Sequence, residues 1–221
     1  MVISEESWLT MATYYAGAIL ATIVEAGYED DPRVDRCFQW LLSMRQDDGG
    51  WTIPMITQKF DRETQYKLQT EFLPPAEPDR TKPFSHNCTG MVLRAFAAHP
   101  IYGHSEDARL AADLLKSRFF QPDAYASLKD ARYWIRFEYP FWWNNLVSAM
   151  DIMVKMEVSA IDPHMKKAIN WLVEHQQSDG LWKVNYYSTD PEKSTPQTLD
   201  RKLWISLAIC RILKDIQVKI A

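Results

Sequence analysis

The chain has 221 residues, of which 47% are apolar and 13% aromatic, enough to bury a core, so wholesale disorder is excluded. Its 25 basic and 29 acidic side chains give a net charge of -4, so the chain lacks the positive field that carries most non-specific nucleic-acid binding. Three cysteines are too few for a disulfide scaffold and favour a reducing cytoplasm. The acidic start and the short apolar run 11–24 predict neither a signal peptide nor a transmembrane segment. We therefore expect a cytoplasmic protein.

Apolar residues recur at helical spacing, and only seven glycines interrupt the chain, which predicts an all-α fold. The pattern indicates helical hairpins, each with a more apolar helix followed by an amphipathic one. In chain order, we predict first helices at 8–26, 85–98, 141–157 and 199–216, and second helices at 31–45, 105–118 and 162–176. The polar connections 52–82 and 183–198 are longer than a compact bundle needs, so we expect functional or mobile loops there. We expect the proline-rich segment 52–82 to be extended unless it folds over a cavity.

Two of the second helices repeat one another. Each begins with an Asp-Pro pair, at Asp31 and at Asp162, which supplies an N-cap and a proline in the first turn. The same residues follow both helices in the same spacing: Gln46, Asp48, Gly49 and Trp51 after the first, and Gln177, Asp179, Gly180 and Trp182 after the second. The chain therefore contains an internal repeat.

These turn residues, in their place behind a helix, resemble the QW repeat of squalene and oxidosqualene cyclases and of protein prenyltransferase β-subunits. The resemblance implies an (α/α) toroid, in which inner and outer helices surround a central cavity. It also implies a structural clasp, in which the glutamine bonds backbone groups at the end of its helix, the glycine turns the chain and the tryptophan covers the neighbouring repeat. We treat residues 1–221 as one such domain. Its three and a half hairpins make an incomplete ring, so an open arc, a ring completed by a second copy or another chain, and a part of a longer protein all stay open.

The residues that carry the chemistry of those enzymes are missing from the sequence. Squalene-type cyclases protonate their substrate with the middle acid of an Asp-x-Asp-Asp run, and neither Asp30-Asp31 nor Asp47-Asp48 belongs to such a run. The sequence also lacks a DDxxD cluster that would hold magnesium against a diphosphate. His86 and Cys88 supply two zinc ligands where a site needs three or four. We therefore predict no metal and no cofactor.

A second alignment concerns polar residues of the first helices. Two of these helices begin with a Pro-Phe-x-x-Asn pattern, which ends at Asn87 in one and at Asn144 in the other. The same offset sets Arg94 opposite Asp151, both in apolar segments where a charge needs a partner or a wet cavity. Two interpretations of Asp151 stay open: a local pair with Lys155 one turn on, or a polar line facing the central cavity. In the second case we expect Arg94 and Asp151 to lie at equal depth and to point into one pocket.

Aromatic side chains crowd the same helix starts. We expect most of them to pack in the core and the rest to line an apolar mouth, which would suit an isoprenoid chain, as the resemblance implies. The predicted ligand-binding residues are His86, Asn87, Arg94, Trp142, Trp143, Asn144 and Asp200, and the candidate catalytic acid is Asp151. Three functions stay open. The first is a toroid that binds an apolar, isoprenoid-class ligand in its concave cavity without the cyclase acids. The second is an isoprenoid-converting enzyme that uses Asp151, and the third is a protein-interaction scaffold that acts through its loops.

Overall fold

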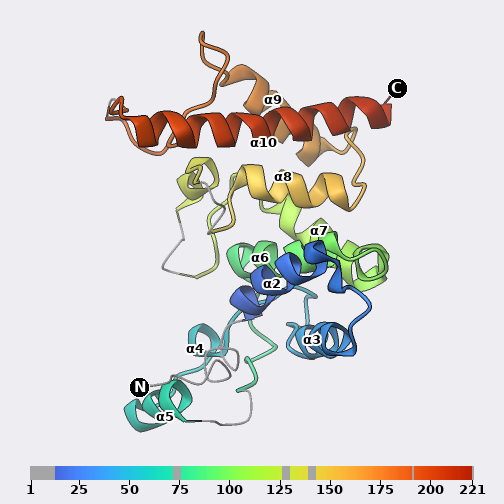
Figure 1. Ribbon diagram of the computed structural model, residues 1–221. Coiled ribbons are helices and arrows are strands. Elements are labelled where there is room, and N and C mark those ends of the chain that lie inside the picture. The colour runs from blue at the N-terminus through green and yellow to red at the C-terminus, as the bar shows by residue number, and fades with distance from the viewer. Residues whose placement is uncertain (1–12, 72–75, 126–129, 139–142, 191, 221) are drawn as a thin grey trace. The chain divides into compact units, whose positions relative to one another are not determined.

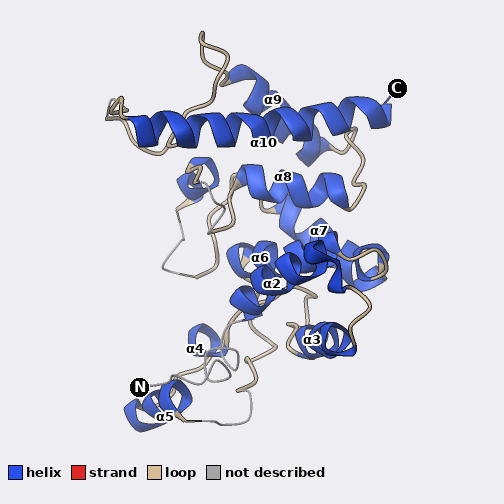
Figure 2. Cartoon of the chain, in the orientation of Figure 1, coloured by secondary structure: helices blue, strands red, loops and turns tan. Residues whose placement is uncertain are grey.

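The computed structural model describes residues 13–71, 76–125, 130–138, 143–190 and 192–220 (Figure 1). Within these ranges the regular structure is helical, apart from an isolated antiparallel bridge between Arg136 and Asn185 (Figure 2). The all-α prediction is thus confirmed. The chain divides into two compact units, Met1–Leu114 and Leu115–Ala221. In the part that the structure describes, no helix is both long enough and apolar enough to cross a lipid bilayer.

The first unit is organised around the packing of α2 against α6. Its helices are α2 (Thr13–Ile23), the π-helical turn η1 (Val24–Tyr28), α3 (Pro32–Ser43), α4 (Pro54–Thr57), α5 (Arg62–Thr70), α6 (His86–Ala98), the 3-10 turn η2 (Tyr102–His104) and α7 (Glu106–Ser117), which crosses the boundary between the units. A Cβ atom at Gly17 would lie 2.5 Å from the Cα of Val92. Glycine is therefore required for the close approach of α2 to α6.

The second unit is built on α8, whose side chains are almost all buried. Its elements are the 3-10 turn η4 (Ala131–Ile135), α8 (Leu146–Lys155), α9 (Pro163–Glu174) and α10 (Pro196–Ile220) (Figure 1). The long helix α10 packs against α8 and buries one row of isoleucines, Ile205, Ile209, Ile212 and Ile216. The opposite side of α10 carries exposed leucines.

The predicted helix positions hold best for the second helices, because their Asp-Pro starts act as N-caps. The carboxylates of Asp31 and Asp162 accept hydrogen bonds from backbone amides in the first turns of α3 and α9. The prediction of an extended segment over 52–82 is wrong, since α4 and α5 form within it. Asp61 caps α5 by accepting a hydrogen bond from the amide of Thr64 at 2.7 Å, and this cap was not recognised in the sequence.

The predicted start of the helix at 141–157 is also wrong. Helix α8 begins at Leu146, later than the predicted 141, because Asn145 and Ser148 form a capping box. The amide of Ser148 donates to Asn145 Oδ1 at 3.1 Å, and the amide of Asn145 donates to Ser148 Oγ at 3.0 Å. Helix α10 begins earlier and ends later than the predicted range 199–216.

Candidate functional site

The first Gln-Trp turn, residues 46–51, closes the end of α3. The ring of Trp51 is completely buried, and its Nε1 donates a hydrogen bond to the carbonyl oxygen of Leu41 at 2.7 Å. Gly49 has a φ of 98°, a left-handed conformation that glycine adopts without strain. Its amide donates to the carbonyl oxygen of Gln46 at 2.9 Å, which closes the turn.

A covering segment lies over this first turn. The side-chain amide of Gln46 donates to the carbonyl oxygens of Asp79 and Lys82, at 2.7 and 2.9 Å. The carboxylate of Asp48 accepts a hydrogen bond from the amide of Phe84 at 2.8 Å. The turn therefore fastens the end of α3 to the segment that leads into α6.

The second Gln-Trp turn, residues 177–182, repeats the same internal geometry behind α9. The indole nitrogen of Trp182 donates to the carbonyl oxygen of Leu172 at 2.7 Å, and its ring is 2% exposed. Gly180 has a φ of 80°, and its amide donates to the carbonyl oxygen of Gln177 at 2.9 Å. The predicted role of the glycine agrees with both turns, whereas each indole bonds the end of its own helix, a contact that the sequence did not predict.

The backbone amide of each tryptophan donates to a buried hydroxyl on a later helix. The amide of Trp51 donates to Oγ1 of Thr89 on α6 at 2.8 Å, and the amide of Trp182 donates to Oγ of Ser206 on α10 at 3.0 Å. Thr89 is fully buried and Ser206 nearly so. Sequence reasoning missed both residues, although a lone hydroxyl on an otherwise apolar helix face is the signal that could have revealed them.

At the start of α6, the structure buries the predicted residues His86 and Asn87. Both lie in the first turn of the helix, where Ser85 accepts a hydrogen bond from the amide of Cys88 at 3.2 Å and so acts as the N-cap. Their exposed fractions are 4% and 7%, so they belong to the interior of the first unit. Arg94 lies further along the same helix and is partly exposed.

The predicted polar line on α8 resolves into two local arrangements. Asn144 is buried beside the helix start and accepts a hydrogen bond from Oγ of Ser148 at 3.3 Å, which adds to the capping box. Asp151 forms an ion pair with Lys155 at 3.2 Å, and 43% and 42% of these two side chains are exposed. The geometry thus favours the local-pair interpretation of Asp151.

The register from which Arg94 and Asp151 were predicted to lie at equal depth differs from the one that the helix caps set, and a common pocket for the two side chains stays a prediction. The N-cap of α6 is Ser85 and that of α8 is Asn145, so the Pro-Phe-x-x-Asn pattern does not set the same register in the two helices. Counted from these caps, Asp151 corresponds to Met91 and not to Arg94. The N-caps therefore give a different correspondence between residues of α6 and α8 from the one that the Pro-Phe-x-x-Asn alignment gave.

The remaining predicted residues are placed as follows. Trp142 lies outside the described residues. Trp143 is half-buried just before α8, and Asp200 is exposed on α10. No three His, Cys, Asp or Glu side chains gather into a metal site in the part of the chain that the structure describes.

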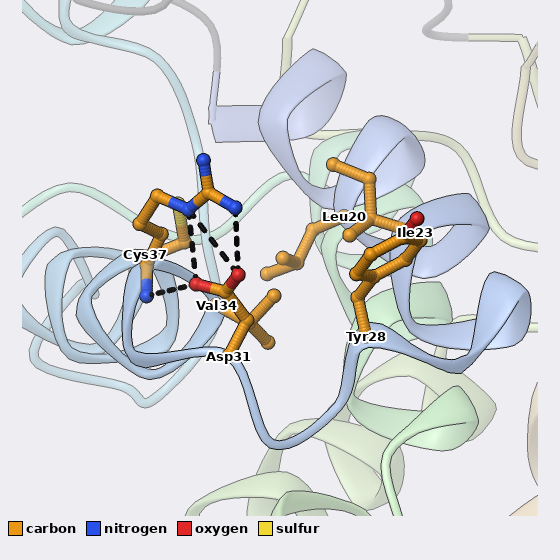
Figure 3. A pocket seen from close by; sticks show the side chains of 7 residues that line it. Leu20, Ile23, Tyr28, Asp31, Val34 and Cys37 are labelled. Atoms are coloured by element: carbon orange, nitrogen blue, oxygen red, sulfur yellow. Dashed lines mark hydrogen bonds and ion pairs between the residues drawn. The ribbon is translucent and has the colours of Figure 1, made fainter.

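A cavity of about 460 Å³ opens between α2 and α3, which the sequence did not predict (Figure 3). It is lined by Leu20, Ile23, Tyr28, Asp31, Arg33, Val34 and Cys37. The side chains of Leu20 and Val34 are buried, whereas 39% of Ile23 and 57% of Tyr28 remain exposed. The cavity therefore has a buried aliphatic floor and an exposed rim with one aromatic ring.

The polar edge of this cavity is a single ion pair. The guanidinium of Arg33 reaches both carboxylate oxygens of Asp31, with Nη2 at 2.7 Å from Oδ2 (Figure 3). Hydrogen bonds from the side chain and then the backbone amide of Arg33 lower the pKa of Asp31 to about 2. The edge therefore presents a charged but internally neutralised pair to anything that enters.

The comparison with known proteins agrees with this helical-repeat geometry. A family model, the squalene-hopene cyclase C-terminal domain, matches residues 13–212. The chain belongs to this family. The squalene-hopene cyclase of Bradyrhizobium diazoefficiens is similar to it, with 24% identity over 185 residues that cover 81% of this chain and 26% of the relative. This family member thus spans about a quarter of the length of the relative it matches.

Membership in the squalene-hopene cyclase C-terminal domain family confirms the resemblance that the two Gln-Trp turns predicted. The all-helical structure is consistent with the (α/α) toroid fold of this family. In this member, the candidate acid Asp151 lies in an ion pair and is partly exposed to water. The apolar cavity lies instead between α2 and α3.

Proposed function

We propose that this squalene-hopene cyclase family member binds an apolar ligand of the isoprenoid class in the cavity between α2 and α3, without cyclising it. The observation that carries the proposal is the aliphatic floor formed by Leu20 and Val34 beneath an open rim. A volume of about 460 Å³ falls within the range of small-molecule sites. Family membership supports the isoprenoid class, because the similar protein is named a squalene-hopene cyclase.

The environment of Asp151 supports binding in preference to proton-initiated cyclisation. Donating a proton to an alkene requires a protonated acid in a site shielded from water, and desolvation is what keeps a carboxyl protonated. Asp151 is 43% exposed and paired with Lys155, which is the opposite environment. The sequence also contains no Asp-x-Asp-Asp run.

The lining of the cavity suggests how a prenyl alcohol would lie in it. Its methyl-branched chain would pack on Leu20 and Val34, with each buried CH₂ group contributing about 0.8 kcal/mol. Its hydroxyl would remain at the rim, near the carboxylate of Asp31 and the ring of Tyr28. Affinity should therefore rise with chain length until the cavity is filled.

Native mass spectrometry and calorimetry with farnesol test this proposal. We expect the full chain to retain farnesol, and Ile23→Asp to weaken binding by about tenfold or more, because the new carboxylate must be desolvated. Ile101→Asp is the matched control, since Ile101 is 74% exposed and does not line the cavity. Equal farnesol affinity in the wild type and Ile23→Asp would contradict the proposed site.

A second experiment separates binding from catalysis. The full chain is incubated with squalene, and cyclic products are sought by gas chromatography and mass spectrometry. We expect no product from the wild type and unchanged farnesol affinity in Asp151→Asn. A cyclic product that disappears in Asp151→Asn would contradict the proposal and favour an enzyme that uses Asp151.

A further inference from the structure

Helix α10 has an exposed apolar face opposite the row of isoleucines that it buries. Leu203 is 50% exposed, Trp204 is 43% exposed and Leu207 is 41% exposed. These three residues lie within about one helical turn of one another, so their side chains form one apolar patch. In the first unit, α6 has no such face, because α2 packs on it and its residues from His86 to Leu93 are all buried. An apolar face of this kind on a long helix marks an interaction surface.

Two of the charges on this side of α10 are arranged symmetrically about Leu207. Asp200 lies seven residues before Leu207 and Lys214 lies seven residues after it, which is about two helical turns in each direction. The three side chains therefore point to the same side of α10, and all three are exposed. Within the described residues, neither Asp200 nor Lys214 takes part in an ion pair.

We propose that this face binds a second copy of the chain, with the two α10 helices antiparallel and crossing at Leu207. In this arrangement Asp200 of each copy lies opposite Lys214 of the other. The contact therefore contains two ion pairs, each between one carboxylate and one ammonium group. Leu203 and Trp204 pack beside the two central leucines. The contact is isologous, which closes the assembly at two copies.

The charge pattern discriminates between occupants and orientations. A parallel pairing would set Asp200 against Asp200 and Lys214 against Lys214, which is unfavourable in both places. The antiparallel pairing joins all four of these charges in ion pairs, and the exposed Arg211, one turn after Leu207, stays outside the two pairs. This self-complementarity is why a second copy fits the face better than an unrelated partner.

Charge reversal tests the pairing in the full chain. We expect the wild type to sediment as a dimer in analytical ultracentrifugation. Asp200→Lys and Lys214→Asp should each weaken dimerisation by about tenfold or more, because each creates two like-charge contacts. An equimolar mixture of the two variants should dimerise again within about threefold of the wild type, since the mixed dimer keeps one original Asp200–Lys214 pair and forms one pair of reversed polarity.

Disulfide trapping tests the position of the crossing point. In a background of Cys37→Ser and Cys210→Ser, we expect Leu207→Cys to form a covalent dimer under mild oxidation, because the two residues meet at the two-fold axis. Leu199→Cys is the matched control: it is 52% exposed, but the two copies of residue 199 would lie about 24 Å apart along the helices.

Several results would overturn the proposal. A monomeric wild type at every concentration would do so, as would an open series of oligomers. Failure of the mixed variants to recover dimerisation, or equal trapping at positions 199 and 207, would exclude the antiparallel contact about Leu207. Binding of the wild type to lipid vesicles through Leu203 and Trp204, without dimerisation, would assign the face to a membrane surface instead.

Discussion

The two Gln-Trp turns share their tryptophan and glycine contacts but differ in what covers them. In the first turn, the side chain of Gln46 donates to two backbone carbonyls, and Gly49 lies against Leu110 of α7. In the second turn, the side chain of Gln177 makes no hydrogen bond within the described residues, and a Cβ at Gly180 would meet no atom within 4 Å. The prediction that the glutamine bonds backbone groups at the end of its own helix is thus wrong, because Gln46 donates instead to the carbonyl oxygens of Asp79 and Lys82.

This difference separates two parts of the motif. The contact from tryptophan to the end of its own helix is internal to one hairpin, so both turns make it. The contact of the glutamine depends on a neighbouring segment, and only the first turn has the stretch 79–84 over it. The side chain of Gln46 therefore connects two segments, whereas each tryptophan bonds the end of its own helix through its indole and the following helix through its backbone amide.

The largest expected effect tests the buried tryptophan, which both Gln-Trp turns share. Trp51→Ala and Trp182→Ala should each lower the free energy of unfolding by ~3–5 kcal/mol, because each removes a buried aromatic ring and leaves a cavity. Urea denaturation of the two variants measures this. A loss below about 1 kcal/mol in either variant would show that its ring is not a clasp.

The second-largest expected effect tests whether the segment 79–84 covers the first Gln-Trp turn. Gly50 and Leu181 occupy the same place in the two turns, and a Cβ at Gly50 would lie 2.4 Å from the Cβ of Phe84. Gly50→Ala should therefore destabilise by about 1–3 kcal/mol through overpacking. The matched change Leu181→Ala, in the open turn, should destabilise less in the same urea titrations. Equal losses would mean that both turns are equally covered.

A third comparison uses the two glutamines directly. Gln46→Ala removes the donor to two carbonyl oxygens and should destabilise by about 1–3 kcal/mol, because those acceptors lose their partner. Gln177→Ala should change the free energy of unfolding by under about 0.5 kcal/mol. Thermal unfolding of both variants measures the two losses. An equal loss of stability in Gln177→Ala and Gln46→Ala would contradict the different roles of the two glutamines.

The smallest effect concerns the helix caps and depends on pH. Burial opposes ionisation of Asp162, but the hydrogen bonds from Lys116 and from the amides of Met165 and His164 lower its pKa overall. Its stabilisation is therefore present above the ordinary pKa of the carboxyl and is lost as the pH falls through the lowered value. Asp162→Ala should cost about 1–2 kcal/mol at pH 7, and the gap from the wild type should narrow below about pH 4. A gap that stays constant down to pH 2 would contradict the assignment.

Local signals explain why much of the fold could be predicted. The Asp-Pro starts of α3 and α9 and the glycines of both turns act within a few residues, so the sequence shows them directly. The start of α8 was mistaken because a capping box at Asn145 outweighed a superficial Pro-Phe pattern. Helix α5 was missed because its cap at Asp61 lies in a stretch with weak apolar periodicity.

The candidate site was less predictable because it depends on the spacing between elements. The cavity lies between α2 and α3, and neither helix shows by itself that Leu20 and Val34 face a common space. The pairing of Asp151 with Lys155 followed from helical spacing and was among the predicted alternatives. The hydroxyls of Thr89 and Ser206 were missed because their partners, Trp51 and Trp182, are distant in sequence.

Hydrogen exchange of side-chain protons, followed by nuclear magnetic resonance, tests the central comparison most directly. The account predicts that the indole protons of Trp51 and Trp182 exchange slowly, because both are buried and donate to the carbonyls of Leu41 and Leu172. The side-chain amide of Gln46 should also exchange slowly, and that of Gln177 rapidly. Equal protection of the two glutamine amides, or rapid exchange at either indole, would contradict a clasp that is shared by both turns and covered at only one.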